Sequence, residues 1–114
     1  MSILEELTAL ITGQGASVET GVFSDVAPDE YVVITPLADT FPLFANNWPQ
    51  YDLQEARLSL YTKGNYLALN SKILEALLTD GYTVSDRRYI GREDDTGYHH
   101  YAIDVAKTYP MYNV

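Results

Sequence analysis

The stretch from residue 52 to residue 81 reads as a strand, a short hinge and a helix. In the strand, Ala56, Leu58 and Leu60 point to one face and polar side chains to the other, as in a half-buried strand. Residues 65–79 then carry apolar side chains at helical spacing. The expected buried stripe of this helix consists of Tyr66, Leu69, Ile73, Ala76 and Leu77. A strand that leads into such a helix predicts a sheet with the helix packed over its apolar face.

The same helix carries a second apolar line, about a third of a turn away from the first. This line consists of Leu67, Leu74 and Leu78. A helix that is apolar over most of its circumference is expected to be covered on two sides. Either the N-terminal helix or a neighbouring subunit could supply the second cover, so these leucines are interface candidates.

The N-terminal part of the chain predicts a helix followed by two strands. The helix stops at Gly13 and Gly15, after about three turns. Residues 18–23 form a weak strand. Residues 31–35 are β-branched almost throughout, which predicts a central strand buried on both faces and ended by Pro36.

Residues 37–50 show neither helical nor strand periodicity and are expected to form a long loop. The loop is unusually apolar, and its large side chains are Phe41, Leu43, Phe44 and Trp48. It could fold onto its own core as a compact flap, or it could carry apolar surface for another molecule. We favour the interface, because Trp and Phe are preferred anchors at protein interfaces.

The C-terminal part predicts a hairpin made of strands 82–90 and 98–109, joined by a turn that contains Asp95-Thr96-Gly97. The fold class is therefore α+β, in one domain spanning residues 1–114. We expect an antiparallel or mixed sheet of four to five strands with two helices packed on one face. The order of elements is α-β-β-β-α-β-β.

The charge of the chain is lopsided, and the whole net charge of −9 comes from residues 1–56. That part has no Lys or Arg, and its acids are Glu5, Glu6, Glu19, Asp25, Asp29, Glu30, Asp39, Asp52 and Glu55. A DNA duplex repels such a surface, so sequence-specific DNA binding is disfavoured. The surplus acid serves solubility, or it forms a surface that DNA passes without sticking.

The sequence predicts a protein that is not an enzyme and needs no cofactor or metal. Adjacent His99 and His100 point to opposite faces of a strand and cannot share one metal. The acids at 93–95 lack the ligand spacing of a calcium loop. Arg87, Arg88 and Arg92 could form a small anion site or interface salt bridges, and we favour pairing with the acids of a neighbouring molecule, because the protein as a whole is acidic. The chain has no cysteine, no apolar run long enough to cross a membrane and no expected signal peptide.

Three segments together resemble one protein family. They are VFSDVAPDEYVVIT at 22–35, ARLSLYTKGNYLALNSKILEALLTDGY at 56–82 and YHHYAIDVAKTY at 98–109. Their order and apolar spacing resemble the tail-completion proteins of long-tailed bacteriophages and prophages, which are also called tail-terminator or head-to-tail joining proteins. The chain differs from this family in the aromatic character of residues 37–50.

The resemblance implies a structural protein of the virion that assembles with itself into a ring, typically a hexamer, at the end of the tail tube. Its other partners would be the tail-tube protein and the head-connector protein, with DNA passing through the hole. It would be made in the cytoplasm of the bacterial host and end in the tail or neck of the virion, with no membrane partner. The alternative is a small acidic binding module, of immunity or regulatory type, that docks through residues 41–48.

Overall fold

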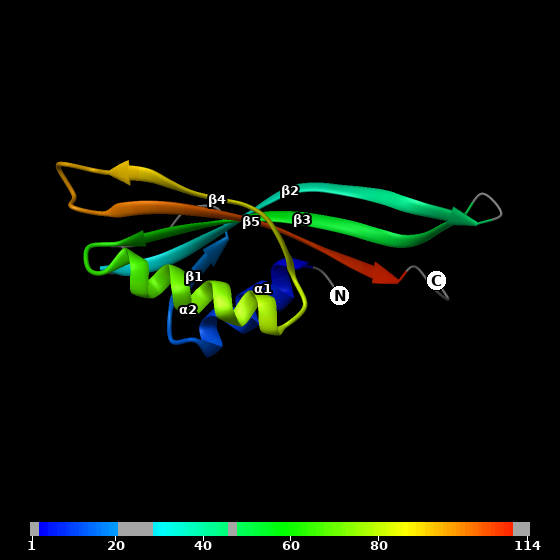
Figure 1. The fold of residues 1–114 in the computed structure, drawn as a ribbon, viewed down its shortest axis with the longest axis horizontal. Coiled ribbons are helices and arrows are strands. Elements are labelled where there is room, and N and C mark those ends of the chain that lie inside the picture. Colours follow the sequence, from blue (N-terminus) through cyan, green and yellow to red (C-terminus); the bar gives the residue numbers. More distant parts are fainter. Residues whose placement is uncertain (1–2, 21–28, 46–47, 111–114) are drawn as a thin grey trace.

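The computed structural model describes residues 3–20, 29–45 and 48–110, with only the backbone for residues 19, 20, 40–45 and 48–50. Its two helices and five strands follow the predicted order (Figure 1). They are α1 (Ile3–Gly13), β1 (Ser17–Thr20), β2 (Glu30–Ala45), β3 (Trp48–Thr62), α2 (Tyr66–Thr79), β4 (Thr83–Arg92) and β5 (His99–Pro110).

The strands form one mixed sheet in the order β1-β2-β3-β5-β4. β1 and β2 run parallel, and the other three pairs are antiparallel. Both helices lie on the same face of this sheet (Figure 1). α1 packs under β1, β2 and β3, and α2 packs under β3, β4 and β5. The predicted fold class, α+β with two helices on one face, is confirmed.

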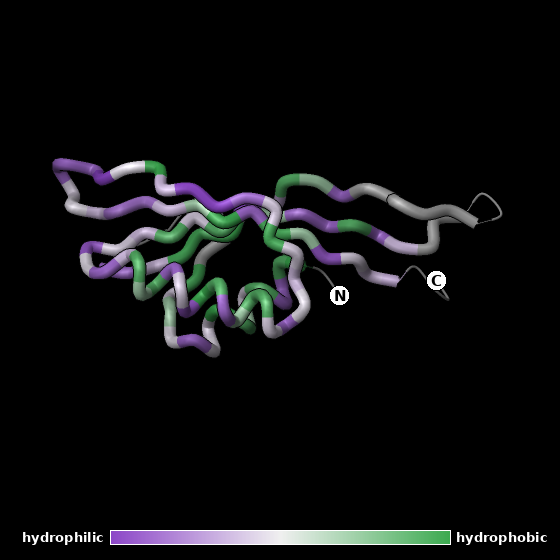
Figure 2. The backbone as a smooth tube through the Cα atoms, viewed as in Figure 1, coloured by the Kyte–Doolittle hydropathy of each residue, from purple (hydrophilic) through white to green (hydrophobic). Residues whose placement is uncertain are grey.

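The core lies between the helices and the sheet, where apolar segments of both layers meet (Figure 2). The predicted strand face is confirmed, because Ala56, Leu58 and Leu60 are all buried. Of the predicted α2 stripe, Leu69, Ile73 and Leu77 are buried, and Tyr66 and Ala76 are partly buried. α1 buries Ile3, Leu7 and Ile11, which are also at helical spacing. The apolar periodicity of the sequence therefore identifies the core correctly.

Two expectations for residues 31–35 are wrong. The segment is not buried on both faces. Val32 and Ile34 point towards the helices and are buried, whereas Tyr31 and Val33 point to the face without helices and are partly exposed (Figure 1). β2 also continues through Pro36. Among the described residues, β1 pairs with β2 only as far as Ile34, so Pro36 stands where its missing N–H is tolerated.

The predicted loop at residues 37–50 is largely a β-hairpin. The β2 part pairs with the start of β3, and the register shifts between Pro36 and Ala38, between Thr40 and Leu43, and between Leu43 and Phe44. Each shift is a bulge-like irregularity that disturbs the alternation of side chains between the two faces. The period-two pattern is therefore lost from the sequence although the backbone pairing persists.

This hairpin extends beyond the helices as an arm, which we define as residues 36–45 and 48–53 (Figure 1). It accounts for much of the elongated shape of the molecule, which measures 55 × 25 × 23 Å. The arm does not fold back over the core, so the compact flap considered from the sequence is not formed.

The ends of α2 follow from local hydrogen bonding. The side chain of Asn65 accepts hydrogen bonds from the backbone N–H groups of Leu67 and Ala68, which have no partner within the helix. Gly81 ends the helix at a φ of 88°, a left-handed conformation that glycine adopts without a side-chain clash. These two residues fix where the helix enters and leaves the layer beneath the sheet.

Candidate interaction surfaces

The second apolar line of α2 is exposed in this protomer. The exposed fraction is 60% for Leu67 and 56% for Leu78, and Leu74 is partly buried. α1 packs against the opposite flank of α2, where Leu10 and Lys72 help to line a groove between the helices. α1 therefore does not cover this line, contrary to one of the two possibilities considered from the sequence. No other described element shields Leu67 or Leu78.

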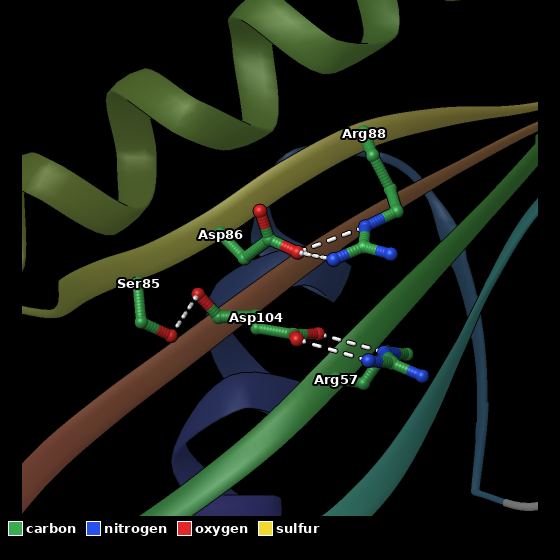
Figure 3. Close-up of polar contacts among 5 residues, drawn as sticks. All are labelled: Arg57, Ser85, Asp86, Arg88 and Asp104. Atoms are coloured by element: carbon green, nitrogen blue, oxygen red, sulfur yellow. Dashed lines mark hydrogen bonds and ion pairs between the residues drawn. The ribbon is translucent and has the colours of Figure 1, made fainter.

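Arginines gather along β4, the last strand of the sheet, and all three predicted ones are exposed. Arg88 donates to the carboxylate of Asp86 on its own strand (Figure 3). Arg92 Nη1 lies 3.5 Å from the Asp94 carboxylate in the following turn. Arg87 makes no ion pair with any other residue that the structure describes. The sequence predicts that acids of a neighbour pair with all three arginines, and Arg87 is the one that lacks an acidic partner among the described residues.

Arg57 and Asp104 join β3 to β5 on the face that the helices leave open (Figure 3). The guanidinium donates through Nε at 2.7 Å and through Nη2 at 3.0 Å to the two carboxylate oxygens. On β4, the hydrogen bonds donated by Arg88 lower the pKa of Asp86 below its ordinary value. The acidic and basic side chains of this part of the open face therefore satisfy one another.

The arm presents apolar side chains to solvent. The exposed fraction is 46% for Leu37 and 41% for Tyr51, and Asp39 is also exposed. The four predicted interface side chains of the arm, Phe41, Leu43, Phe44 and Trp48, lie outside the described side chains. Their role in an interface remains a prediction.

A row of aromatic rings crosses the open face of the sheet. Tyr31, Tyr61 and His100 stand at paired positions on β2, β3 and β5, with ring centroids 4.8 Å and 4.3 Å apart. The ring of Tyr98 packs edge-on against the rings of Tyr31 and Tyr61. Burial lowers the pKa of His100 and raises the pKa of Tyr61. Sequence reasoning missed this row, because only the strand register brings its members together.

His99 lies on the other face, as the alternation of a strand predicts. Its ring stands 4.9 Å from that of Tyr66 on α2, and Nδ1 is 2.9 Å from the hydroxyl oxygen of Tyr89. The two histidines are thus separated by the sheet and cannot bind one metal together. Among the described residues, no group of three His, Asp or Glu side chains is arranged to hold a metal ion.

A second cluster missed from the sequence lies where α1 meets β5. Lys107 Nζ is 3.4 Å from a carboxylate oxygen of Glu6, 101 positions away in the sequence. It also lies over the rings of Tyr82 and Tyr109. Burial raises the pKa of Tyr82 to about 12. This cluster connects α1 to β5, and no pattern in the sequence links such distant residues.

No family model matches this chain, and no curated protein matches it. Within the described residues, no helix is both long and apolar enough to cross a membrane.

Proposed function

We propose that this protein is a structural, non-enzymatic subunit of the tail-completion type. Copies of the chain assemble into a ring at the end of a bacteriophage or prophage tail tube. The ring joins the tube to the head connector, and DNA passes through its hole. The order of elements that suggested this family in the sequence is also the order found in the fold.

The exposed leucine line of α2 is the observation that carries the proposal. Leu67 and Leu78 lie on one flank of a helix whose other flank is packed against α1. Burying a whole leucine side chain contributes about 1.5–3 kcal/mol, so leaving two of them half in water is unfavourable for an isolated protomer. A neighbouring subunit that covers them provides a physical reason for their exposure.

The charge of the chain supports the same function. A ring that surrounds DNA must let the duplex move, so its lumen should not bind phosphate groups. A net charge of −9 suits such a surface. The projecting arm, with Leu37 and Tyr51 exposed, provides further surface for contact with a subunit or with the tube.

Sedimentation velocity of the purified chain over a wide concentration range tests the proposal. A ring predicts one large species of fixed stoichiometry, in equilibrium with the protomer and with no broad series of intermediates. A chain that stays monomeric over the whole range contradicts the ring. That result would favour the alternative function, an acidic binding module that docks through residues 41–48.

A further inference from the structure

The order of strands in the sheet separates the two halves of the sequence in space. β1 and β2 form one side of the sheet above α1, and β5 and β4 form the other side above α2. β3 lies between them and contains the point at which the character of the sequence changes, near residue 56. The lopsided charge along the chain thus becomes a charge difference across the sheet.

One side is the acidic flank, which we define as α1, β1 and β2. No Lys or Arg exists anywhere in this part of the sequence. Glu5 on α1, Asp29 just before β2 and Asp39 on the arm are exposed there, and Lys63 Nζ lies 3.6 Å from the Asp29 carboxylate. The outer surface of α1 also presents a shallow, partly apolar area, lined by Leu4 and Ala9 among others. This flank offers negative charge together with some apolar surface.

The other side is the arginine flank, which we define as β4 and the leucine line of α2. Arg87 stands opposite Ile103, whose side chain is buried in the core, so it lies on the face that carries α2. Arg92 is exposed farther along the same strand, where its guanidinium also lies 3.5 Å from the Asp94 carboxylate. The exposed side chains of Leu67 and Leu78 lie on α2, on the flank that faces away from α1. This flank offers positive charge together with apolar surface.

We propose that the arginine flank of one copy docks against the acidic flank of the next copy. This inference rests on the proposed function and specifies which surfaces meet in the ring. The partner is a second copy of this chain, because the chain itself carries both complementary surfaces. The contact buries the exposed leucines and brings Arg87, which makes no ion pair with another described residue, towards the acids of a neighbour.

The arrangement also specifies the symmetry of the assembly. Two acidic flanks repel each other, so a two-fold contact of that flank with itself is disfavoured. A contact between two different surfaces leaves one free copy of each surface at the ends of any open chain of subunits. Such a contact closes into a ring when a whole number of the rotations that relate neighbouring subunits adds up to one full turn. The same sheet can therefore build a ring without any further interface.

Charge reversal on one flank at a time tests the inference. The acidic-flank variant is Asp29→Lys/Asp39→Lys, and the arginine-flank variant is Arg87→Glu/Arg92→Glu. Each variant alone places like charges across every contact, so we expect its association to weaken at least tenfold. In a 1:1 mixture, every contact between unlike variants joins opposite charges. Sedimentation should therefore show the assembly restored in the mixture.

Two controls each reverse one charge at a position outside the two defined flanks, which is half the charge change of each double variant. Lys72→Glu lies in the groove between the helices, and Asp95→Lys lies in the turn between β4 and β5. Both should assemble like the wild type. Thermal melting of every variant checks that the fold is kept, as expected for substitutions of exposed side chains.

Rings formed by either reversed variant alone would overturn the inference and leave the proposed ring intact. A mixture that stays monomeric while the wild type assembles would also overturn it. A wild type that never assembles would instead overturn the proposed function. Assembly that is lost in each variant alone and restored in their mixture supports both the docking of unlike flanks and the proposed ring.

Discussion

His100 shows how the strand register decides the environment of a single residue. It stacks on Tyr61 on the open face, while the adjacent His99 packs beside Tyr66 and Tyr89 on the face that carries α2. Burial holds the pKa of His100 below its ordinary value. Its neutral form is therefore favoured in the folded protein more than in the unfolded chain.

The pH dependence of stability should reflect this histidine. The unfolded chain binds a proton at His100 near the ordinary pKa of about 6.5, and the folded protein binds it only at lower pH. The free energy of unfolding is then expected to fall as the pH decreases from 7.5 to 5.5. Urea denaturation at several pH values measures this change.

His100→Phe keeps an aromatic ring in the row and removes the titrating group, so the loss of stability between pH 7.5 and 5.5 should shrink. His99→Gln serves as the matched control and should retain the wild-type loss. An equal pH dependence in His100→Phe and the wild type would show that the buried imidazole does not cause it.

At the scale of the element, the proposed assembly assigns folding to one apolar line of α2 and association to the other. Leu77 is fully buried beneath the sheet, and its neighbour Leu78 is more than half exposed. Leu77→Ala is expected to lower the free energy of unfolding by about 2–5 kcal/mol, because it leaves a cavity in the core. Leu78→Ala should change the stability of the protomer by less than about 0.5 kcal/mol. Chemical denaturation of dilute protein measures both.

Leu78→Ala should affect association, although it leaves the stability of the protomer nearly unchanged. Leu78→Ala should weaken assembly measurably at concentrations where the wild type is assembled, because a neighbouring subunit loses apolar contact there. If Leu78→Ala assembled with unchanged affinity, the leucine line would have no part in the subunit contact.

The elements show what the sequence could predict and why the remainder was missed. The helices and the strand face of β3 follow from regular apolar spacing, and most of the side chains that this spacing indicates are buried, whereas Tyr66 and Ala76 are only partly buried. The arm was mistaken for a loop, because register shifts interrupt its alternation and because Pro36 suggested an end. The aromatic row and the Lys107 cluster were missed, because they depend on pairings between distant strands and helices.

At the scale of the whole molecule, the residues of the candidate surfaces can be found from local sequence patterns, but their relative positions depend on the order of the strands. The leucine line and the arginines of β4 were identified from the sequence as interface candidates. Their position on one flank, opposite the flank that holds the surplus acid, follows only from the strand order. Sequence alone could not place them there, since β5 inserts between β3 and β4.

Salt should weaken the assembly if charges join the flanks. The Debye length is about 10 Å at 0.1 M and about 3 Å at 1 M, so exposed charges interact much less at high ionic strength. Raising NaCl from 0.05 M to 0.5 M is expected to shift the sedimentation equilibrium towards the protomer. Association that strengthens steadily with salt would indicate a purely apolar contact.

Electron microscopy of the assembled wild-type chain, in negative stain and at low salt, tests the central claim most directly. If copies dock side by side through unlike flanks, class averages should show closed rings of one size, with rotational symmetry and a central hole. Isolated particles no longer than a single 55 Å protomer, or two-fold dimers, would contradict it.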